Sequence, residues 1–126
     1  MDDFDVLLKA AQEAAVNYQA SEDVHVGSVG AALLTEGGRI FTGACVDCIC
    51  GIGFCAEHSA IAEMLKHRIT HVLAVVAWDS SGKVLSPCGR CRQFLHEIDD
   101  NNWDTRVYLD SGTVVTLREL LPFAPE

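Results

Sequence analysis

The stretch "HVLAVVAW", residues 71–78, decides the fold. Its side chains are nearly all apolar, without the alternation of apolar and polar positions that marks a strand with one face in water. Such a run predicts a central strand that is covered on both faces. We therefore expect a sheet with helices packed against it.

Two predicted helices flank this strand along the chain. The first should run from about Cys55 to His67, and the second begins within "SPCGRCRQFLHEI", residues 86–98. Ser86 is placed to cap the second helix, and Pro87 suits its first position. Because one helix precedes the central strand and the other follows it, their N-termini can face each other at one edge of the sheet.

The rest of the chain supplies further elements around this unit. An apolar stripe predicts a helix over residues 3–19, and Thr116 with Glu119 forms a capping box for a short last helix that Pro122 stops. Four more strands are predicted at residues 24–35, 39–45, 105–110 and 113–117. The order α-β-β-α-β-α-β-β-α predicts an α/β fold with a five-stranded mixed sheet, in a single domain over residues 1–126.

Composition narrows the class of partner. The 9 basic and 18 acidic residues give a formal charge of −9, which would repel a phosphate backbone, so we expect no nucleic-acid partner. No apolar run approaches the roughly 20 residues of a membrane span, and the acidic start "MDDFD" differs from a signal peptide. We expect a soluble cytoplasmic protein, in which the six cysteines serve as metal ligands or free thiols.

Three of these cysteines fall in the first turns of the two predicted helices. Cys55 opens one helix, and Cys88 and Cys91 open the other. Three thiolates make up three corners of a tetrahedral zinc site and leave the fourth open, as in catalytic zinc centres. Glu57 follows Cys55 by two residues and could accept a proton from zinc-bound water. The spacing therefore predicts a catalytic Zn²⁺ site.

These residues also carry a resemblance to a known family. Cys55-Ala56-Glu57, followed by "PCGRC" at 87–91, matches the metal signature of the zinc nucleobase deaminases. From about residue 21 to residue 122 the chain resembles the small cytidine deaminases that act on free nucleosides, including their blasticidin-S deaminase branch. The similar segments are "VGAALLTEGGRIFTGACV" (29–46), "FCAEHSAI" (54–61), "SPCGRCRQFL" (86–95) and "LRELLP" (117–122).

The resemblance implies a three-layer fold and a hydrolytic deamination of cytosine to uracil. Zn²⁺ would be bound by Cys55, Cys88 and Cys91, while Glu57 would protonate ring nitrogen N3 and help to expel ammonia. The backbone around Ala56 would hydrogen-bond the pyrimidine. The family also implies a homotetramer, with a dimer as the smaller alternative, and a role in pyrimidine salvage or in detoxification.

The chain departs from the family's pattern in the residues that would contact the substrate. Cys45-Val46-Asp47 stands where cytidine deaminases usually have Asn-x-Glu to bind the ribose 3′-hydroxyl. Asp47 can still accept a sugar hydroxyl, whereas Cys45 is a poor substitute for an amide. Ser28 lies in a segment without the family's aromatic residue, and Phe123 follows the last helix, where the family often closes an aromatic over the substrate. A cytosine-nucleoside analogue such as blasticidin S is therefore the alternative to cytidine.

A further departure concerns the charge around the thiolates. The family usually has an Arg after the catalytic Glu that donates to the thiolates, and this chain has His58. His58 and Arg90 are the candidates to replace it, and we favour Arg90 because a guanidinium is always charged.

A structural zinc module remains as an alternative from a different class. Cys45 and Cys48 with Cys88 and Cys91 form a C-x₂-C pair twice, which would make the protein a non-catalytic binding module. This alternative leaves Cys55 and Glu57 without a role. In the simpler reading, Cys45, Cys48 and Cys50 are small buried residues with free thiols.

Overall fold

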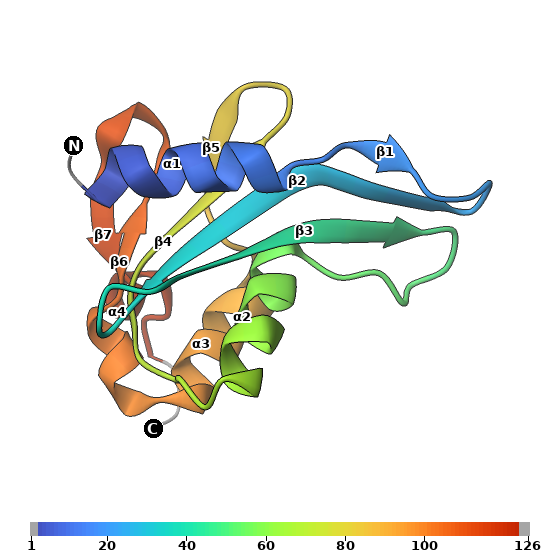
Figure 1. The fold of residues 1–126 in the computed structure, drawn as a ribbon. Helices are drawn as coiled ribbons and strands as arrows, with labels where there is room; N and C mark the ends of the chain where they lie inside the picture. The colour runs from blue at the N-terminus through green and yellow to red at the C-terminus, as the bar shows by residue number, and fades with distance from the viewer. Residues whose placement is uncertain (1–2, 124–126) are drawn as a thin grey trace.

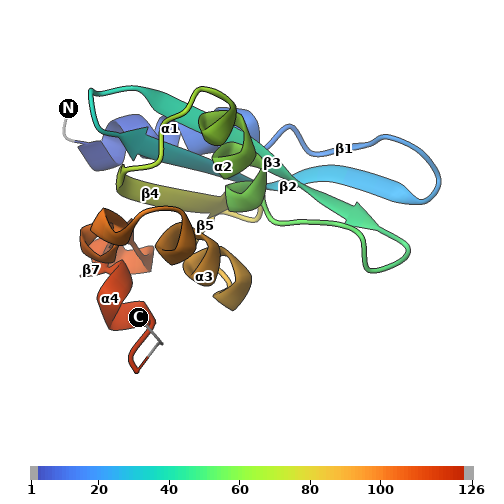
Figure 2. The ribbon, with the colours of Figure 1, turned by 90° about the horizontal axis from the view of Figure 1, so that it is seen from below.

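The computed structural model describes residues 3–123 and has a mixed sheet between two layers of helices (Figure 1). Helix α1 (Asp3–Ala14) covers one face of the sheet. The other face is covered by α2 (Ala56–Lys66), α3 (Gly89–Ile98) and α4 (Leu117–Leu120), as the view from below also shows (Figure 2). The predicted three-layer α/β fold is confirmed.

The sheet contains the five predicted strands and two short additional ones. Strands β3, β2, β4, β6 and β7 follow one another across the sheet, and only the β4–β6 pair is parallel. The additional strands are β1, which pairs with the outer part of β2, and β5, which pairs with the end of β4. Their bounds are β1 Tyr18–Gln19, β2 Val24–Thr35, β3 Ile40–Cys48, β4 Val72–Asp79, β5 Lys83–Leu85, β6 Arg106–Tyr108 and β7 Val114–Thr116.

Two predicted element boundaries were wrong. The first helix ends at Ala14 rather than at residue 19, because the chain turns at Asn17, whose φ is 42°, and Tyr18 then joins the sheet. Helix α3 begins at Gly89 with Cys88 as its N-cap, so Ser86 does not cap it. The capping box of Thr116 and Glu119 is confirmed at α4.

Close packing of α2 on the sheet fixes the position of the first predicted metal ligand. A Cβ atom on Gly43 of β3 would lie 2.4 Å from the backbone nitrogen of Ala60 and 2.5 Å from the carbonyl oxygen of Ala56. Only glycine permits this approach, and the helix then buries Ile61 and Met64 in the core. The N-terminus of α2 is thereby held directly against β3.

The described helices include none that is both long and apolar enough to cross a membrane.

Candidate metal centre and active site

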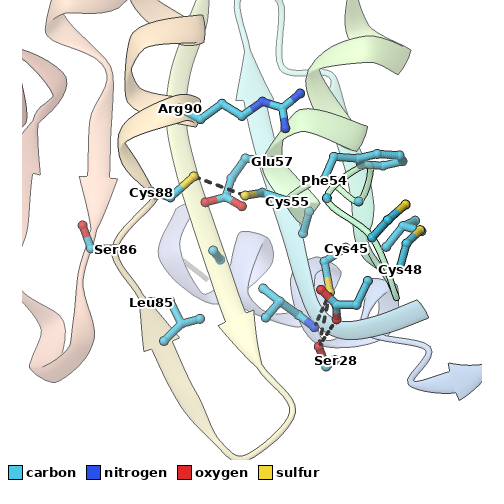
Figure 3. A pocket seen from close by; sticks show the side chains of 18 residues that line it. Ser28, Cys45, Cys48, Phe54, Cys55, Glu57, Leu85, Ser86, Cys88 and Arg90 are labelled. Atoms are coloured by element: carbon cyan, nitrogen blue, oxygen red, sulfur yellow. Dashed lines mark hydrogen bonds between the residues drawn. The ribbon is translucent and has the colours of Figure 1, made fainter. Parts of the chain in front are cut away.

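Three cysteine thiols converge where α2 and α3 begin (Figure 3). Cys55 is the N-cap of α2, Cys88 is the N-cap of α3, and Cys91 lies buried in the first turn of α3. The three Sγ atoms lie within 4.8 Å of one another, and the Sγ atoms of Cys55 and Cys88 are 3.2 Å apart. The convergence predicted from the spacing is therefore present in the structure.

Electrostatics make this trio unfavourable as free thiolates. Burial first, and then the hydrogen bond with Cys88 and the charge of Cys88, raise the pKa of Cys55 to about 11. Burial likewise raises the pKa of Cys91, followed by the negative charges of Glu57, Cys55 and Cys88. Burial also acts upward on Cys88, but hydrogen bonds with Cys55 and Cys91 leave its pKa below the ordinary value. A cation is needed before all three can ionise together at neutral pH.

The donor set fits zinc. Thiolates are preferred ligands of Zn²⁺, and a tetrahedral ion with Zn–S bonds of about 2.3 Å spaces its sulfur ligands roughly 3.8 Å apart. The observed Sγ separations, all within 4.8 Å, are compatible with that spacing. Within residues 3–123 the group holds three cysteines and no fourth His, Cys, Asp or Glu ligand, and Cys55 and Cys88 line the neighbouring cavity. A zinc ion bound there would keep one coordination position for water or substrate.

Glu57 places a buried carboxyl beside the thiols. It is the second residue of α2, only 4% exposed, and its carboxylate lies next to the sulfurs of Cys55 and Cys88 (Figure 3). Burial raises its pKa, and a hydrogen bond to its own backbone N–H offsets part of the rise. A buried carboxyl with a raised pKa can take up and release a proton near neutral pH.

These residues line one end of a cavity of about 450 Å³. Its walls include the apolar side chains of Val29, Phe54, Ala77 and Leu85. Ala56, which lies between Cys55 and Glu57 in the sequence, also lines the cavity. Arg90 is the one basic residue among the described residues that line it. Such a mainly apolar cavity with a few convergent polar groups is typical of a small-molecule site.

Ser28 and Cys45 lie at the opposite end of the cavity (Figure 3), and Asp47, which also lines the cavity, is hydrogen-bonded to both. The N–H of Val29 donates to Cys45 Sγ at 3.3 Å, and the Ser28 hydroxyl donates to Asp47 Oδ2 at 3.4 Å. Ser28 Oγ also lies 3.3 Å from the Cys45 sulfur. Cys45 is buried, so its thiol is engaged within the wall, whereas Asp47 is exposed.

Three further residues were predicted for the site, namely His58, Arg90 and Phe123. His58 packs between the rings of Phe54 and Phe94, each 5.3 Å away, and burial and then the charge of Arg90 lower its pKa. Across residues 3–123, neither His58 nor Arg90 donates a hydrogen bond to a thiol of the trio. Phe123 is exposed and is not among the residues that line the cavity.

The second group of cysteines does not join the metal-binding trio. Cys45, Cys48 and Cys50 line the cavity as free thiols, but the metal-capable group within the described chain contains none of them. Only Cys45 is buried; Cys48 is half-buried and Cys50 exposed, which corrects the expectation of three buried residues. The four-cysteine module that would join Cys45 and Cys48 to Cys88 and Cys91 is not formed.

One residue beside the site was missed in the sequence. Arg92 follows Cys91 and donates three side-chain hydrogen bonds, to the Pro87 carbonyl, the Ser86 hydroxyl and the Leu120 carbonyl. Leu120 is 28 residues away along the chain, so a local pattern could not reveal this contact.

Comparison with known proteins agrees with this geometry. Residues 2–105 match the family described as the cytidine and deoxycytidylate deaminase zinc-binding region. The chain is 34% identical over 115 residues to a cytidine deaminase of Halalkalibacterium halodurans, covering 84% of this chain and 86% of that protein. It is 41% identical over 71 residues to a cytidine deaminase of Mycobacterium tuberculosis, in an alignment that spans only about half of that relative, 53% of its length.

Solved structures extend the similarity to the whole fold. The crystal structure of cytidine deaminase from M. tuberculosis superposes with a TM-score of 0.82 at 31% identity, covering 100% of this chain and 99% of that one. The cytidine deaminase from Mycobacterium leprae gives a TM-score of 0.79 at 33% identity, covering 97% and 99% of the two chains.

The metal site makes a direct prediction about zinc content. Cys55→Ser, Cys88→Ser or Cys91→Ser should each lose most of the bound zinc, because two thiolates are left to bind the ion. Elemental analysis of the purified variants after dialysis measures this. Cys45→Ser is the matched control and should keep one zinc per chain; its loss of zinc would favour the four-cysteine module instead.

Proposed function

Because the chain belongs to the cytidine and deoxycytidylate deaminase zinc-binding family, we propose that it deaminates a free cytosine nucleoside by hydrolysis. Water and the nucleoside would give the uracil nucleoside and ammonia. The observation that carries the proposal is the buried Glu57 carboxyl beside three thiols, at the end of a cavity with apolar walls. The reaction needs a proton carrier at this place, next to a metal.

Bound zinc would supply Lewis acidity, which lowers the pKa of a coordinated water from that of bulk water towards neutrality. Glu57 carries the protons. It accepts one proton from the attacking water and delivers it to ring nitrogen N3 as the new C4–O bond forms. It then takes the second proton from the oxygen now bonded to C4 and gives it to the amino group, so that the C4–N bond breaks, ammonia leaves and the C4 carbonyl of uracil forms. Burial of Glu57 suits both directions of transfer, because the raised pKa lies closer to those of its proton donor and acceptors.

The cavity would hold the base between its apolar walls. Val29, Phe54 and Leu85 would offer apolar surface to the ring, and the backbone around Ala56, which also lines the cavity, would hydrogen-bond its polar edge. Asp47 and Ser28 at the other end would receive the sugar. Among the described residues, two acidic side chains, Asp47 and Glu57, and one basic side chain, Arg90, line the cavity. The excess of negative charge favours an uncharged nucleoside over a nucleotide, whose phosphate is negative.

The changed sugar end supports a second substrate. Cys45 is bound within the wall, and Asp47 reaches one methylene less far than a Glu would. This end of the cavity is therefore polar, but its carboxylate extends less far towards the substrate. A modified sugar, as in blasticidin S, is the alternative to ribose there. The enzyme would then act in the cytoplasm in detoxification rather than in pyrimidine salvage.

Ammonia release tests the proposed function directly. The zinc-loaded protein should release ammonia from cytidine or deoxycytidine, and more slowly from deoxycytidylate, because the two carboxylates repel the phosphate. Cytosine, N4-substituted cytidines and blasticidin S complete the panel. Release from blasticidin S alone would select the second substrate, and release from none would refute the deaminase function.

On the best substrate of that panel, Glu57→Gln serves as the matched variant. It keeps the shape of the side chain but cannot accept a proton, so kcat should fall by about 10²–10⁴-fold. Zinc content and the far-ultraviolet circular dichroism spectrum should stay at wild-type values. A variant as active as wild type would exclude Glu57 as the proton carrier.

The proposed sugar contact of Asp47 predicts a specific loss. Asp47→Ala should reduce kcat/KM for cytidine roughly 10- to 100-fold, the range expected for a hydrogen bond to a charged group. The same substitution should have little effect on a cytidine analogue that lacks the hydroxyl bound by Asp47. Steady-state kinetics with 2′-deoxy- and 3′-deoxycytidine identify that hydroxyl, and an equal loss on every analogue would contradict the contact.

Exposed apolar side chains at the rim of the cavity favour an assembly of several chains. Ile49 and Ile52 are 82% and 76% exposed, and they flank Cys50 and Gly51, which line the cavity. Phe123 is also fully exposed. These patches are consistent with the homotetramer expected from the family resemblance, with a dimer as the smaller alternative.

Light scattering of the purified protein measures the assembly. We expect the mass of four chains for wild type and a smaller mass for the double variant Ile49→Asp and Ile52→Asp, because charge on the patch opposes its burial. Val6→Asp, at an exposed position on α1, is the control and should not change the mass. A wild-type mass of one chain would exclude the assembly.

A further inference from the structure

Of the three metal-binding cysteines, Cys88 is the least supported by packing. Cys91 is fully buried within α3, and Cys55 follows a pair of backbone hydrogen bonds, 2.9 Å each, between Phe54 and Val46. Cys88 is exposed and lies in the segment 86–88, between the end of β5 and the start of α3. Its position must therefore depend on hydrogen bonds to the chain on either side of it.

Arg92 provides those hydrogen bonds on both sides of Cys88. Its Nε donates to the carbonyl oxygen of Pro87 at 2.7 Å, which holds the peptide group before Cys88. Its backbone N–H donates to the carbonyl oxygen of Cys88 at 3.0 Å, which holds the peptide group after it. One residue thus fixes the two peptide planes between which the Cα of Cys88 lies.

The rest of the guanidinium ties this segment to the C-terminal helix. Nη2 donates to the Ser86 hydroxyl at 2.9 Å, and Nη1 donates to the carbonyl oxygen of Leu120 at 3.2 Å, at the end of α4. The three acceptors are two backbone carbonyl oxygens and one hydroxyl oxygen, so the side chain of Arg92 holds the segment around Cys88 and does not donate to a sulfur. Charge-assisted bonds from a rigid planar group hold such a geometry better than bonds from a flexible ammonium.

We propose that Arg92 is a positioning residue for the metal centre, which sets the place of Cys88 and thereby the zinc affinity. The inference rests on the zinc site of the proposed function but not on its substrate. Lysine cannot replace Arg92, because a single ammonium group cannot reach all three oxygens that the planar guanidinium group contacts. Partners that orient metal ligands typically contribute about 10–100-fold to metal affinity.

The test measures zinc affinity by competition with a chromogenic chelator, using the full chain. Arg92→Gln should weaken zinc binding by about 10–100-fold, and Arg92→Lys by about tenfold. Ser86→Ala, which removes one bond of the three, should have a smaller effect. Arg106→Gln is the matched control, because Arg106 also makes two side-chain hydrogen bonds, to Asp3 and Tyr108, but far from the metal site.

Cobalt substitution separates positioning from general stability. The visible absorption of Co²⁺ reports the geometry of its ligands, so Arg92→Lys should change the band shape while Arg106→Gln keeps the wild-type spectrum. If Arg92→Gln does not fold, Arg92→Lys and Ser86→Ala carry the test. Wild-type zinc affinity and cobalt spectrum in both Arg92→Lys and Ser86→Ala, or equal zinc loss in Arg92→Gln and Arg106→Gln, would overturn the proposal.

The two proposals fail in different ways. A wild-type protein that binds zinc and deaminates nothing would refute the deaminase and leave the role of Arg92 standing. An active deaminase whose Arg92 variants bind zinc normally would refute only the role of Arg92.

Discussion

The site depends on how four acidic groups can lie side by side where two helices begin. The thiols of Cys55, Cys88 and Cys91 and the carboxyl of Glu57 meet there, and the charge of Glu57 raises the pKa of Cys55 and Cys91. Two like charges about 4 Å apart repel by roughly 4 kcal/mol at an effective dielectric constant of 20. Three ionised thiols beside a carboxylate are therefore unstable without a cation among them. The same constraint explains why the Cys55 thiol and the Glu57 carboxyl can be two residues apart, because a dication attracts both groups.

The fold satisfies this constraint by bringing two helix N-termini to one edge of the central strand. Strand β4 separates α2 from α3 in the chain, and the first thiol of each helix lies 33 residues from the other in sequence. The free N–H groups at the helix N-termini add positive potential where the thiolates would gather. Gly43 matters for the same reason, since any larger residue would push α2 and its ligand away from the sheet.

Local sequence signals predicted most of this arrangement. The apolar run of β4 and the capping box of α4 are each specified by neighbouring residues, and each was found. Strand β1 was missed because Tyr18 also continues the apolar stripe of the preceding helix, and β5 because Lys83–Leu85 lies in no longer run of strand-forming residues. Their pairing with β2 and β4 comes from tertiary contacts. The α3 boundary was misplaced because Ser86 looks like a cap, whereas its hydroxyl instead accepts a hydrogen bond from Arg92.

The same distinction applies within the site. The metal ligands and Glu57 form a short motif, so their types and spacing suffice to predict them. The support of Cys88 by Arg92 involves the distant Leu120 and needs the folded chain. His58 depends on folded-chain contacts as well: its ring lies between Phe54 and Phe94, and burial and then the charge of Arg90 lower its pKa.

The two ends of the cavity are under different physical constraints. At the metal end, the charge of each group shifts the pKa of its neighbours, so a substitution of one cysteine changes the electrostatics of the others. At the sugar end, the Cys45 thiol accepts the N–H of Val29 and contacts Ser28, which connects β2 to β3 without involving the metal. Asp47 belongs to the same group, since its Oδ2 accepts the Ser28 hydroxyl at 3.4 Å and the Cys45 thiol at 3.9 Å. Hydrogen bonds among its own side chains therefore hold this end of the cavity, whereas the metal end depends on a cation. A substitution at position 45 or 47 should accordingly change the proposed sugar contact and leave Cys55, Glu57, Cys88 and Cys91 in place.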